Sequence, residues 1–269
     1  MESYLCVTCG TLYPPSDREP EHCPICEDDR QYVNPHGQQW TTLEGERGAH
    51  ANRFTALAPG LTTIATEPKL GIGQRAHLIE TEHGNILWDL VAYFDDATIA
   101  AVRAHGDIAA IAISHPHFYT TMGAWSQALG NLPIYLHRDN EPWVMRPDPA
   151  IRFWESETLE VAPGITLLRC GGHFPGSTVL HWRNGAGGRG TLLTGDTIKV
   201  AADRRWVTCM YSYPNAIPLD TATVRSIAAR VEPLAFAELY DGWDSVAGDA
   251  HDAVQRSAER YIAHLGGTV

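Results

Sequence analysis

Charged residues are scarce in this chain of 269 residues, where Asp, Glu, Lys and Arg make up 19% of the positions. Basic residues are rarer than acidic ones, 20 against 32, which gives a formal net charge of -12. This charge disfavours a nucleic-acid partner, because the protein would repel a polyanion. No apolar run approaches the length of a membrane span, and the first residues carry neither a basic nor an apolar targeting segment. We therefore expect a soluble, cytoplasmic protein with no membrane partner.

Internal repeats and low-complexity tracts are also missing. The glycine-rich stretch 185–190 lacks the Lys-Ser/Thr pair of a phosphate-binding loop, so we expect it to be a hairpin loop. The length suits one large domain, or one domain with a small appendage, and suffices to bury a core without disulfides.

Cysteines are few, but four of the six fall in the first 26 residues as two C-x2-C pairs, Cys6 with Cys9 and Cys23 with Cys26. A tight turn that presents two sulfurs supplies half of a tetrahedral metal shell, and a second such turn completes it. Disulfides rarely persist in the cytosol, so a metal bound by four thiolates is favoured over two disulfides.

The two pairs resemble the knuckles of rubredoxins and rubredoxin-like zinc ribbons, with Gly10 after the first pair, Tyr13 nearby and Pro24 inside the second. The resemblance implies a small ribbon over residues 1–32 with a closed, structural metal site. Zinc is the expected occupant and iron the alternative, because both metals accept four thiolates.

Residues 33–68 are polar and rich in Pro and Gly breakers, so we expect a linker that packs on a main domain of residues 69–269. In the main domain, segments 75–80 and 85–89 predict a hairpin. Further strands are expected at 108–114, 134–137, 165–170, 178–182, 191–194 and 235–240, and helices at 98–104, 122–129, 223–231 and 249–264. Strands grouped first and then alternating with helices predict an α+β fold of stacked sheets covered by helices.

Two histidines, His115 and His117, follow the expected strand 108–114, and Pro116 between them favours an extended His115. In extended backbone, residues i and i+2 point the same way, so both imidazoles can face one metal ion. By itself this pair is as well explained by two unrelated loop histidines. His173 and Asp196 each follow another expected strand and add two more side chains able to bind a metal.

The H-x-H segment, the His-x-x-Gly-Ser segment at His173 and the Gly-Asp segment at Asp196 resemble, in the same order, those of the metallo-beta-lactamase superfamily over about residues 70–265. The resemblance implies an αββα metallo-beta-lactamase sandwich with a metal site at one edge between the sheets. It also implies that His115, His117 and His173 bind a metal ion and that Asp196 binds or bridges one. Three imidazoles would leave an open position on zinc for a water whose pKa falls to about 7.

The sequence departs from the full family pattern H-x-H-x-D-H, because Tyr119 and Thr120 stand at the positions of its Asp and second His. A later family histidine is also missing after the strand 235–240, where Asp241 and Asp244 are the nearest carboxylates. We therefore expect one metal ion, zinc or alternatively iron, in the main site. Asp196 is one catalytic candidate, and Tyr119 is the other as a neutral donor to an oxyanion, with a packing role as its alternative.

These residues predict a metallo-hydrolase in which metal-bound hydroxide attacks an ester, thioester, lactone or similar small molecule. One alternative is a mononuclear iron oxygenase or redox protein that uses two histidines and one carboxylate. The other is a catalytically inactive binding module.

Several further residues are weaker candidates for this site. His77 is the other histidine to check, and Cys209 with Met210 follows the Gly-Asp segment closely. Four tryptophans could line an apolar pocket nearby, although such residues more often lie in cores: Trp125, Trp143, Trp154 and Trp243.

Overall fold

The computed structural model describes residues 1–267. The chain forms two compact units, one of residues 1–136 and 140–153, the other of residues 137–139 and the chain from 154 onward. Each unit has its own β-sheet. No helix within residues 1–267 is both long enough and apolar enough to cross a bilayer.

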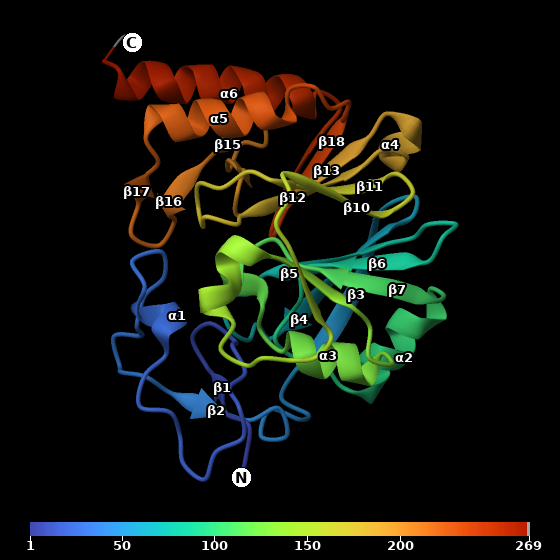
Figure 1. Ribbon diagram of the computed structural model, residues 1–269, viewed down its shortest axis with the longest axis vertical. Helices are drawn as coiled ribbons and strands as arrows, with labels where there is room; N and C mark the ends of the chain where they lie inside the picture. Colours follow the sequence, from blue (N-terminus) through green and yellow to red (C-terminus); the bar gives the residue numbers. More distant parts are fainter. Residues whose placement is uncertain (268–269) are drawn as a thin grey trace. The chain divides into compact units, whose positions relative to one another are not determined.

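The first unit carries a seven-stranded sheet in the order β3-β4-β5-β6-β7-β8-β9. Its strands are β3 Ala51–Ala58, β4 Leu61–Glu67, β5 Arg75–Ile79, β6 Asn85–Trp88, β7 Ile108–Ala112, β8 Ile134–His137 and β9 Ile151–Trp154. Strands β3 to β6 are antiparallel, and β6, β7 and β8 are parallel. Helices α2, Asp96–Ala104, and α3, Met122–Ala128, connect the parallel strands and lie on one face of the sheet (Figure 1).

Strands β3 and β4 correct the expectation that residues 33–68 form an irregular linker. Polar residues of β3, such as Asn52 and Arg53, are tolerated because β3 is the edge strand of the sheet. The threonines and Ile64 of β4 are β-branched residues that favour strands, and this strand is almost fully buried. The sequence Ala-Pro-Gly before Leu61 is the turn of the hairpin and not part of a linker.

The amino-terminal cysteine segment belongs to the same compact unit as this sheet. Its elements are β1 Leu5–Cys6, the short helix α1 Pro24–Glu27 and β2 Trp40–Thr41, and β1 pairs with β2. Because that pairing joins the chain near residue 40 to the first knuckle, the segment extends past the expected boundary at 32. We call residues 1–41 the cysteine ribbon.

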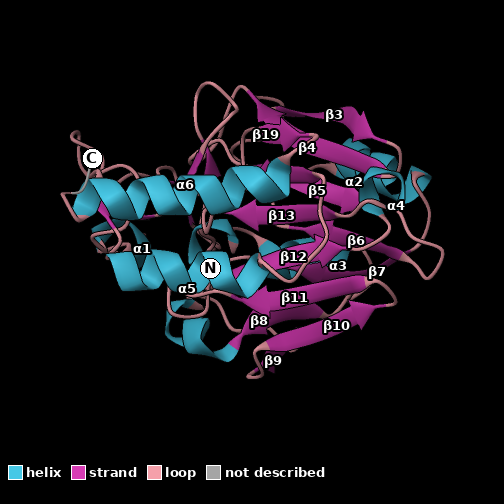
Figure 2. Ribbon diagram, turned by 90° about the horizontal axis from the view of Figure 1, so that it is seen from above, coloured by secondary structure: helices cyan, strands magenta, loops and turns pink. Residues whose placement is uncertain are grey.

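The second unit carries a six-stranded sheet in the order β10-β11-β12-β13-β18-β19. Its strands are β10 Thr158–Ala162, β11 Ile165–Arg169, β12 Thr178–Trp182, β13 Thr191–Gly195, β18 Glu238–Asp241 and β19 Ser245–Ala247. Two small antiparallel pairs, β14 Lys199–Val200 with β15 Val207–Thr208 and β16 Met210–Ser212 with β17 Ile217–Pro218, follow β13. Helices α5, Thr221–Val231, and α6, Ala250–Leu265, run side by side over the sheet (Figure 2).

Helices α2 and α5 begin two residues earlier than the apolar periodicity predicts because aspartates cap them. Asp95 accepts a hydrogen bond from the Thr98 amide at 2.8 Å, and α2 starts at Asp96. Asp220 does the same for α5 through the amides of Ala222 and Thr223. The stretch 185–190 connects β12 to β13 as expected for a hairpin, with one short helical turn, α4 Gly185–Gly188.

Gly190, just before β13, lies where no side chain fits. Its φ is +85°, and a Cβ there would lie 1.9 Å from the Ala235 carbonyl oxygen. Gly188 has the same φ of +85°, yet a Cβ on it meets no described atom within 4 Å. We expect Gly190→Ala to lower the free energy of unfolding by about 3 kcal/mol more than Gly188→Ala does. Denaturant unfolding of both variants measures this difference, and equal losses would contradict the contact.

His77 is buried in β5, between Thr63 of β4 and Trp88 of β6. Burial, helped by the nearby Arg75 charge, lowers the pKa of His77 to about 3, from 6.5. Between pH 6.5 and 3, His77 is protonated in the unfolded chain but not in the folded chain. The contribution of the buried His77 to the free energy of unfolding is therefore fully present above pH 6.5 and is lost as the pH falls towards 3.

We expect the native protein to lose roughly 2 to 3 kcal/mol more of its free energy of unfolding between about pH 6.5 and 4.5 than His77→Gln does. Unfolding curves at the two pH values measure the loss. The exposed His83, changed to Gln, is the matched control, and a loss equal in all three proteins would show that His77 does not titrate in this way.

Candidate metal sites

The four cysteines of the ribbon converge on one point. Their sulfurs lie within 4.8 Å of one another, and the Cys6–Cys26 and Cys9–Cys23 sulfur pairs are each 3.6 Å apart. A tetrahedral shell with bonds of about 2.3 Å requires sulfur separations of about 3.8 Å, whereas a disulfide requires about 2.05 Å. All four side chains are buried, and the structure brings the four predicted cysteines together in a cluster that fits one tetrahedral zinc or iron ion.

Polar side chains support the sulfurs from outside the cluster. The Tyr13 hydroxyl donates to Cys23 Sγ at 3.2 Å, and the Gln38 amide donates to Cys6 Sγ at 3.0 Å. Hydrogen bonds from neighbouring thiols lower the pKa of Cys6 and of Cys23, whereas burial raises that of Cys9. Burial also raises the pKa of Tyr13, so its hydroxyl keeps the proton that it donates to sulfur.

In the first unit, the carboxyl end of β7 positions His115 and His117. His115 is extended, with φ −166° and ψ 170°, as Pro116 predicts, but His117 lies in the 3-10 turn Pro116–Phe118. The two rings nevertheless meet edge to face, with centroids 5.1 Å apart, and both side chains are buried. The structure therefore brings this predicted pair together, although only one of the two residues is extended.

Ser114 and Asp89 fix the orientation of His115. The amide and hydroxyl of Ser114 both donate to Asp89 Oδ1, at 2.7 and 2.8 Å. Since its hydroxyl proton is used in this way, the Ser114 oxygen accepts the proton of His115 Nδ1 at 2.8 Å. This arrangement selects the tautomer in which Nε2 carries the lone pair that a metal requires.

In the second unit, His173 and Asp196 face each other. His173 Nδ1 donates to the backbone carbonyl of Tyr211 at 2.9 Å, which leaves the lone pair on Nε2. That nitrogen lies 3.8 Å from Asp196 Oδ2, and both side chains are nearly fully buried. An imidazolium–carboxylate hydrogen bond would be about 2.7 to 2.9 Å, whereas two ligands of one zinc ion lie roughly 3.4 Å apart. The distance therefore fits a cation between the two atoms better than a direct hydrogen bond.

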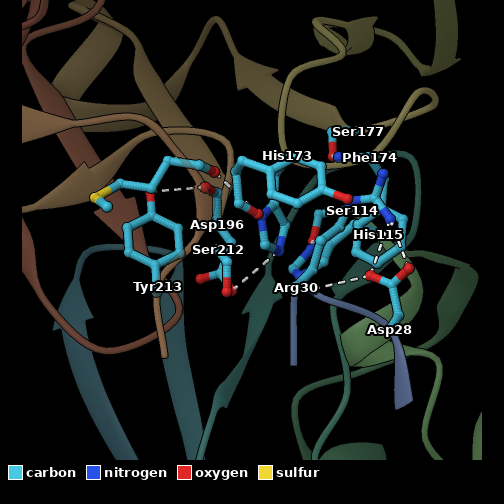
Figure 3. Close-up of polar contacts among 12 residues, drawn as sticks. Asp28, Arg30, Ser114, His115, His173, Phe174, Ser177, Asp196, Ser212 and Tyr213 are labelled. Atoms are coloured by element: carbon cyan, nitrogen blue, oxygen red, sulfur yellow. Dashed lines mark hydrogen bonds and ion pairs between the residues drawn. The ribbon is translucent and has the colours of Figure 1, made fainter. Parts of the chain in front are cut away.

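Asp196 is held in the loop after β13 through its backbone. The Tyr213 hydroxyl donates to the Asp196 carbonyl at 2.9 Å (Figure 3), and burial raises the pKa of Tyr213, so this donor stays protonated. Thr194 Oγ1 donates to the Ile198 carbonyl at 2.6 Å and closes the same loop. The carboxylate is thus presented by a fixed backbone and not by a mobile surface turn.

Asp241 and Asp244 are structural. Asp241 is buried, and its two oxygens accept from the amides of Val200, Trp243 and Asp244 at 2.6 to 2.7 Å. Asp244 instead pairs with the Arg204 guanidinium at 2.8 Å. Neither carboxylate is therefore a good substitute for the missing family ligand.

Tyr119 and Thr120 lie directly after the H-x-H segment. Burial raises the pKa of Tyr119 well above its ordinary value, a shift partly offset by a side-chain hydrogen bond with Asn140. The phenol is therefore neutral and able to donate, as required of an oxyanion donor. Thr120 is buried and adopts a left-handed φ of +36°.

The weaker candidates pack elsewhere. His77 lies in β5, and Cys209 is a buried core thiol whose pKa is raised to about 12 by burial. The Met210 carbonyl lies 3.3 Å from His173 Nδ1. The tryptophans make separate contacts: Trp125 with Phe94, Trp143 with the cysteine cluster, Trp154 with His137 and Trp243 with Lys199.

The supporting residues of the histidines were not predicted. Asp89 and Ser114 are the last residues of the predicted segments 85–89 and 108–114, and an Asp at a strand end and a Ser before the first His were the available signals. The Tyr211 carbonyl could not be predicted, since it lies 38 residues from His173 and is a backbone group.

Comparison with known proteins gives one sequence relative and several structural ones. No family model matches the chain. The chain is 50% identical over 268 residues to the uncharacterized protein YmaE of Bacillus subtilis (strain 168), covering 98% of this chain and 97% of that protein.

Among solved structures, VMB-1 superimposes with a TM-score of 0.60 and 13% identity, over 80% of this chain and 98% of that one. The DIM-1 metallo-beta-lactamase gives 0.57 and 11%, over 78% and 97%. FIM-1 of Pseudomonas aeruginosa, a metallo-beta-lactamase in a mono-zinc form, gives 0.54 and 16%, over 78% and 95%. These likenesses confirm the predicted metallo-beta-lactamase sandwich fold.

Proposed function

This chain belongs to one family with YmaE of Bacillus subtilis and has the metallo-beta-lactamase fold, and on that premise we propose that it is a metal-dependent hydrolase of a small molecule. The observation that carries the proposal is the buried His173–Asp196 pair, whose facing nitrogen and oxygen are spaced for a cation. The substrate class we propose is an ester, thioester or lactone, because a hydroxide nucleophile at neutral pH suffices for such acyl groups.

The proposed metal site joins the two pairs, with His115, His117, His173 and Asp196 around one ion. Hydrogen bonding at Nδ1 selects Nε2 as the ligand atom in both His115 and His173. All four side chains are buried, so only water and a substrate would reach the ion. Three imidazoles and one carboxylate suit zinc, and they also suit iron.

A divalent ion bound there would supply an acidified water, with a pKa near 7 on zinc, and would polarise the substrate carbonyl. The remaining steps belong to the residues of this chain. Asp196 accepts a hydrogen bond from the attacking water and orients it, and its carboxylate is the nearest candidate to take up the proton. Tyr119, which is neutral, donates a hydrogen bond to the developing oxyanion. The proton then passes to the leaving oxygen or sulfur as its bond to carbon breaks.

We propose one ion and not two. A phenol and a hydroxyl, Tyr119 and Thr120, replace the second set of family ligands, and the Asp241 carboxylate is used by three backbone amides. FIM-1 is described in a mono-zinc form, so a single ion is compatible with this fold.

The proposal is tested by removing metal with a chelator and reloading the protein with zinc(II) or with iron(II). We expect the zinc form to hydrolyse at least one ester, thioester or lactone of a broad panel, and the metal-free form to hydrolyse none. Oxygen consumption by the iron form, with no hydrolysis by either form, would favour the iron oxygenase instead. No turnover by either loaded form would favour a binding module.

Ser114→Ala tests the orientation of His115. The variant removes the acceptor of the Nδ1 proton and the link to Asp89, so we expect main-site metal affinity to fall about 10- to 100-fold. Chelator competition measures the affinity. The control is Ser126→Ala, since Ser126 is also a buried serine and its hydroxyl donates to the Leu132 carbonyl at 2.6 Å. Equal affinities in the two variants would exclude this role for Ser114.

A further inference from the structure

The cysteine ribbon is hydrogen-bonded to the segment that carries the first histidine pair. The Leu12 amide, three residues after Cys9, donates to the backbone carbonyl of Thr120 at 3.1 Å. Thr120 has a left-handed φ of +36°, a conformation that costs a threonine about 1 to 3 kcal/mol and persists only where its surroundings enforce it. The bond from the ribbon therefore holds a strained residue three positions after His117.

Close backbone packing adds to this hydrogen bond. A Cβ on Gly10 would lie 2.6 Å from Ala92 Cβ and 3.7 Å from Thr120 Cγ2. The Ala92 carbonyl in turn accepts a hydrogen bond from Thr121 Oγ1 at 3.1 Å. The knuckle, the chain after β6 and the end of the H-x-H segment thus form one contact in which no spare methyl group fits.

The cysteine cluster also contacts the chain after β8. Trp143 packs against the cysteine cluster, and the Arg30 guanidinium lies 5.9 Å from its ring centroid. Arg30 is fixed by an ion pair with Asp28 at 2.9 Å (Figure 3), and Arg146 donates to Ser3 Oγ at 3.1 Å. The ribbon is therefore joined to the rest of its unit at several places, and the segment that carries His115 and His117 is one of them.

We propose that the cysteine ribbon is a clamp on the segment 115–121, so that metal bound by the four cysteines raises the affinity of His115 and His117 for the main-site ion. The inference rests on the proposed function, since it assumes that these histidines bind metal. Leu12 and Gly10 are positioning residues in it: they hold the backbone at Thr120 and touch neither substrate nor metal.

The physical link is the dependence of a small ribbon on its metal. Four-thiolate modules of this size bury too little apolar surface to fold without the ion. When the ribbon loses its metal, the Thr120 carbonyl loses its donor, and the strained turn can relax. A ligand pair that must then be reordered on binding has a lower affinity, because the ordering cost is subtracted from the binding free energy.

Gly10→Ala tests the clamp in the full-length protein, because the added methyl group separates the knuckle from Ala92 and Thr120. Gly48→Ala is the matched control: Gly48 has a φ of +80° against +78° for Gly10, and a Cβ on it meets no described atom within 4 Å. The double variant Gly10→Ala, Ala92→Gly removes the colliding methyl group and keeps the same backbone strain. Cobalt(II) is the probe, since a four-thiolate cobalt site has intense sulfur-to-metal absorption that a nitrogen and oxygen site lacks.

Cobalt affinity at the nitrogen and oxygen site is measured by chelator competition. We expect Gly10→Ala to weaken it about 10-fold or more, Gly48→Ala to leave it within about threefold, and the double variant to restore it. Because coupling is reciprocal, occupancy of that site must raise the affinity of the cysteines by the same factor.

An unchanged affinity in Gly10→Ala, or a loss that Ala92→Gly does not repair, overturns the clamp. Native protein that binds cobalt only through thiolates would instead overturn the proposed main site, so the two failures are distinguishable. If Gly10→Ala also loses the cobalt bound by the four cysteines, its nitrogen and oxygen site must still bind cobalt more weakly than in the native protein, because the clamp requires a folded ribbon.

Discussion

Replacing His173 by alanine is expected to remove the main-site ion and to lower hydrolytic turnover at least about 1,000-fold. His173 supplies a ligand nitrogen whose tautomer is fixed by the Tyr211 carbonyl, and it faces Asp196 across a gap spaced for a cation. Without the imidazole, Asp196 loses the ligand nitrogen that faces it at 3.8 Å. Elemental analysis and turnover are measured on the same preparation, and the cysteine-bound ion is expected to remain.

Asp196→Asn is the companion variant. It keeps the shape of the side chain but removes its charge and its capacity to take up a proton, so metal affinity and turnover should both fall. His181→Gln is the control, because His181 is another buried histidine of the same unit, and its Nε2 contacts the Ala235 carbonyl at 2.8 Å. If His173→Ala kept its full metal complement and its turnover, the proposed site would be wrong.

Replacing Cys26 by serine is expected to remove the ribbon ion and to lower the melting temperature by more than about 10 °C. The four cysteines, with Tyr13 and Ile25, are the core of the ribbon, and Trp40, Trp143 and Met145 pack on that core. Because the cysteine cluster lies in the same compact unit as the seven-stranded sheet, we expect its loss to affect more than the ribbon itself. Calorimetry and elemental analysis measure the two effects.

Cys170→Ala is the control for the cysteine variant. Cys170 is partly exposed and lies outside both candidate metal sites, so its loss should change the melting temperature by only a few degrees and the metal content not at all. A Cys26→Ser protein that melts like the Cys170 variant would show that the ribbon metal does not contribute to the stability of the folded unit.

The two clusters of candidate ligands were predictable from the sequence because their spacing is local or their order is distinctive. Two C-x2-C pairs define a tetrahedral site without any knowledge of the fold. His115 and His117 alone are weak evidence for a metal site. They became informative together with His173 and Asp196, because the segments follow one another in the order of the family. The α+β sandwich followed from the same resemblance and from the order of apolar segments.

The remainder depends on contacts between distant parts of the chain. Strand β3 was not predicted, because exposed polar residues at a sheet edge look like a linker in a sequence, and its buried partner β4 was not predicted either. The Leu12–Thr120 hydrogen bond joins two backbone groups that are far apart in sequence, so no residue type announces it. The left-handed φ of Thr120 is likewise a consequence of packing and not of its own preference.

The central claim is that His115, His117, His173 and Asp196 bind a single ion. Anomalous diffraction from crystals, collected at the absorption edge of the bound metal, tests it most directly. We predict two peaks in each chain: one among the four cysteine sulfurs, and one within about 2.0 to 2.2 Å of the three histidine Nε2 atoms and an Asp196 oxygen. No peak at the histidines of fully metal-loaded protein, or two peaks there about 3.5 to 4 Å apart, would contradict the mononuclear site.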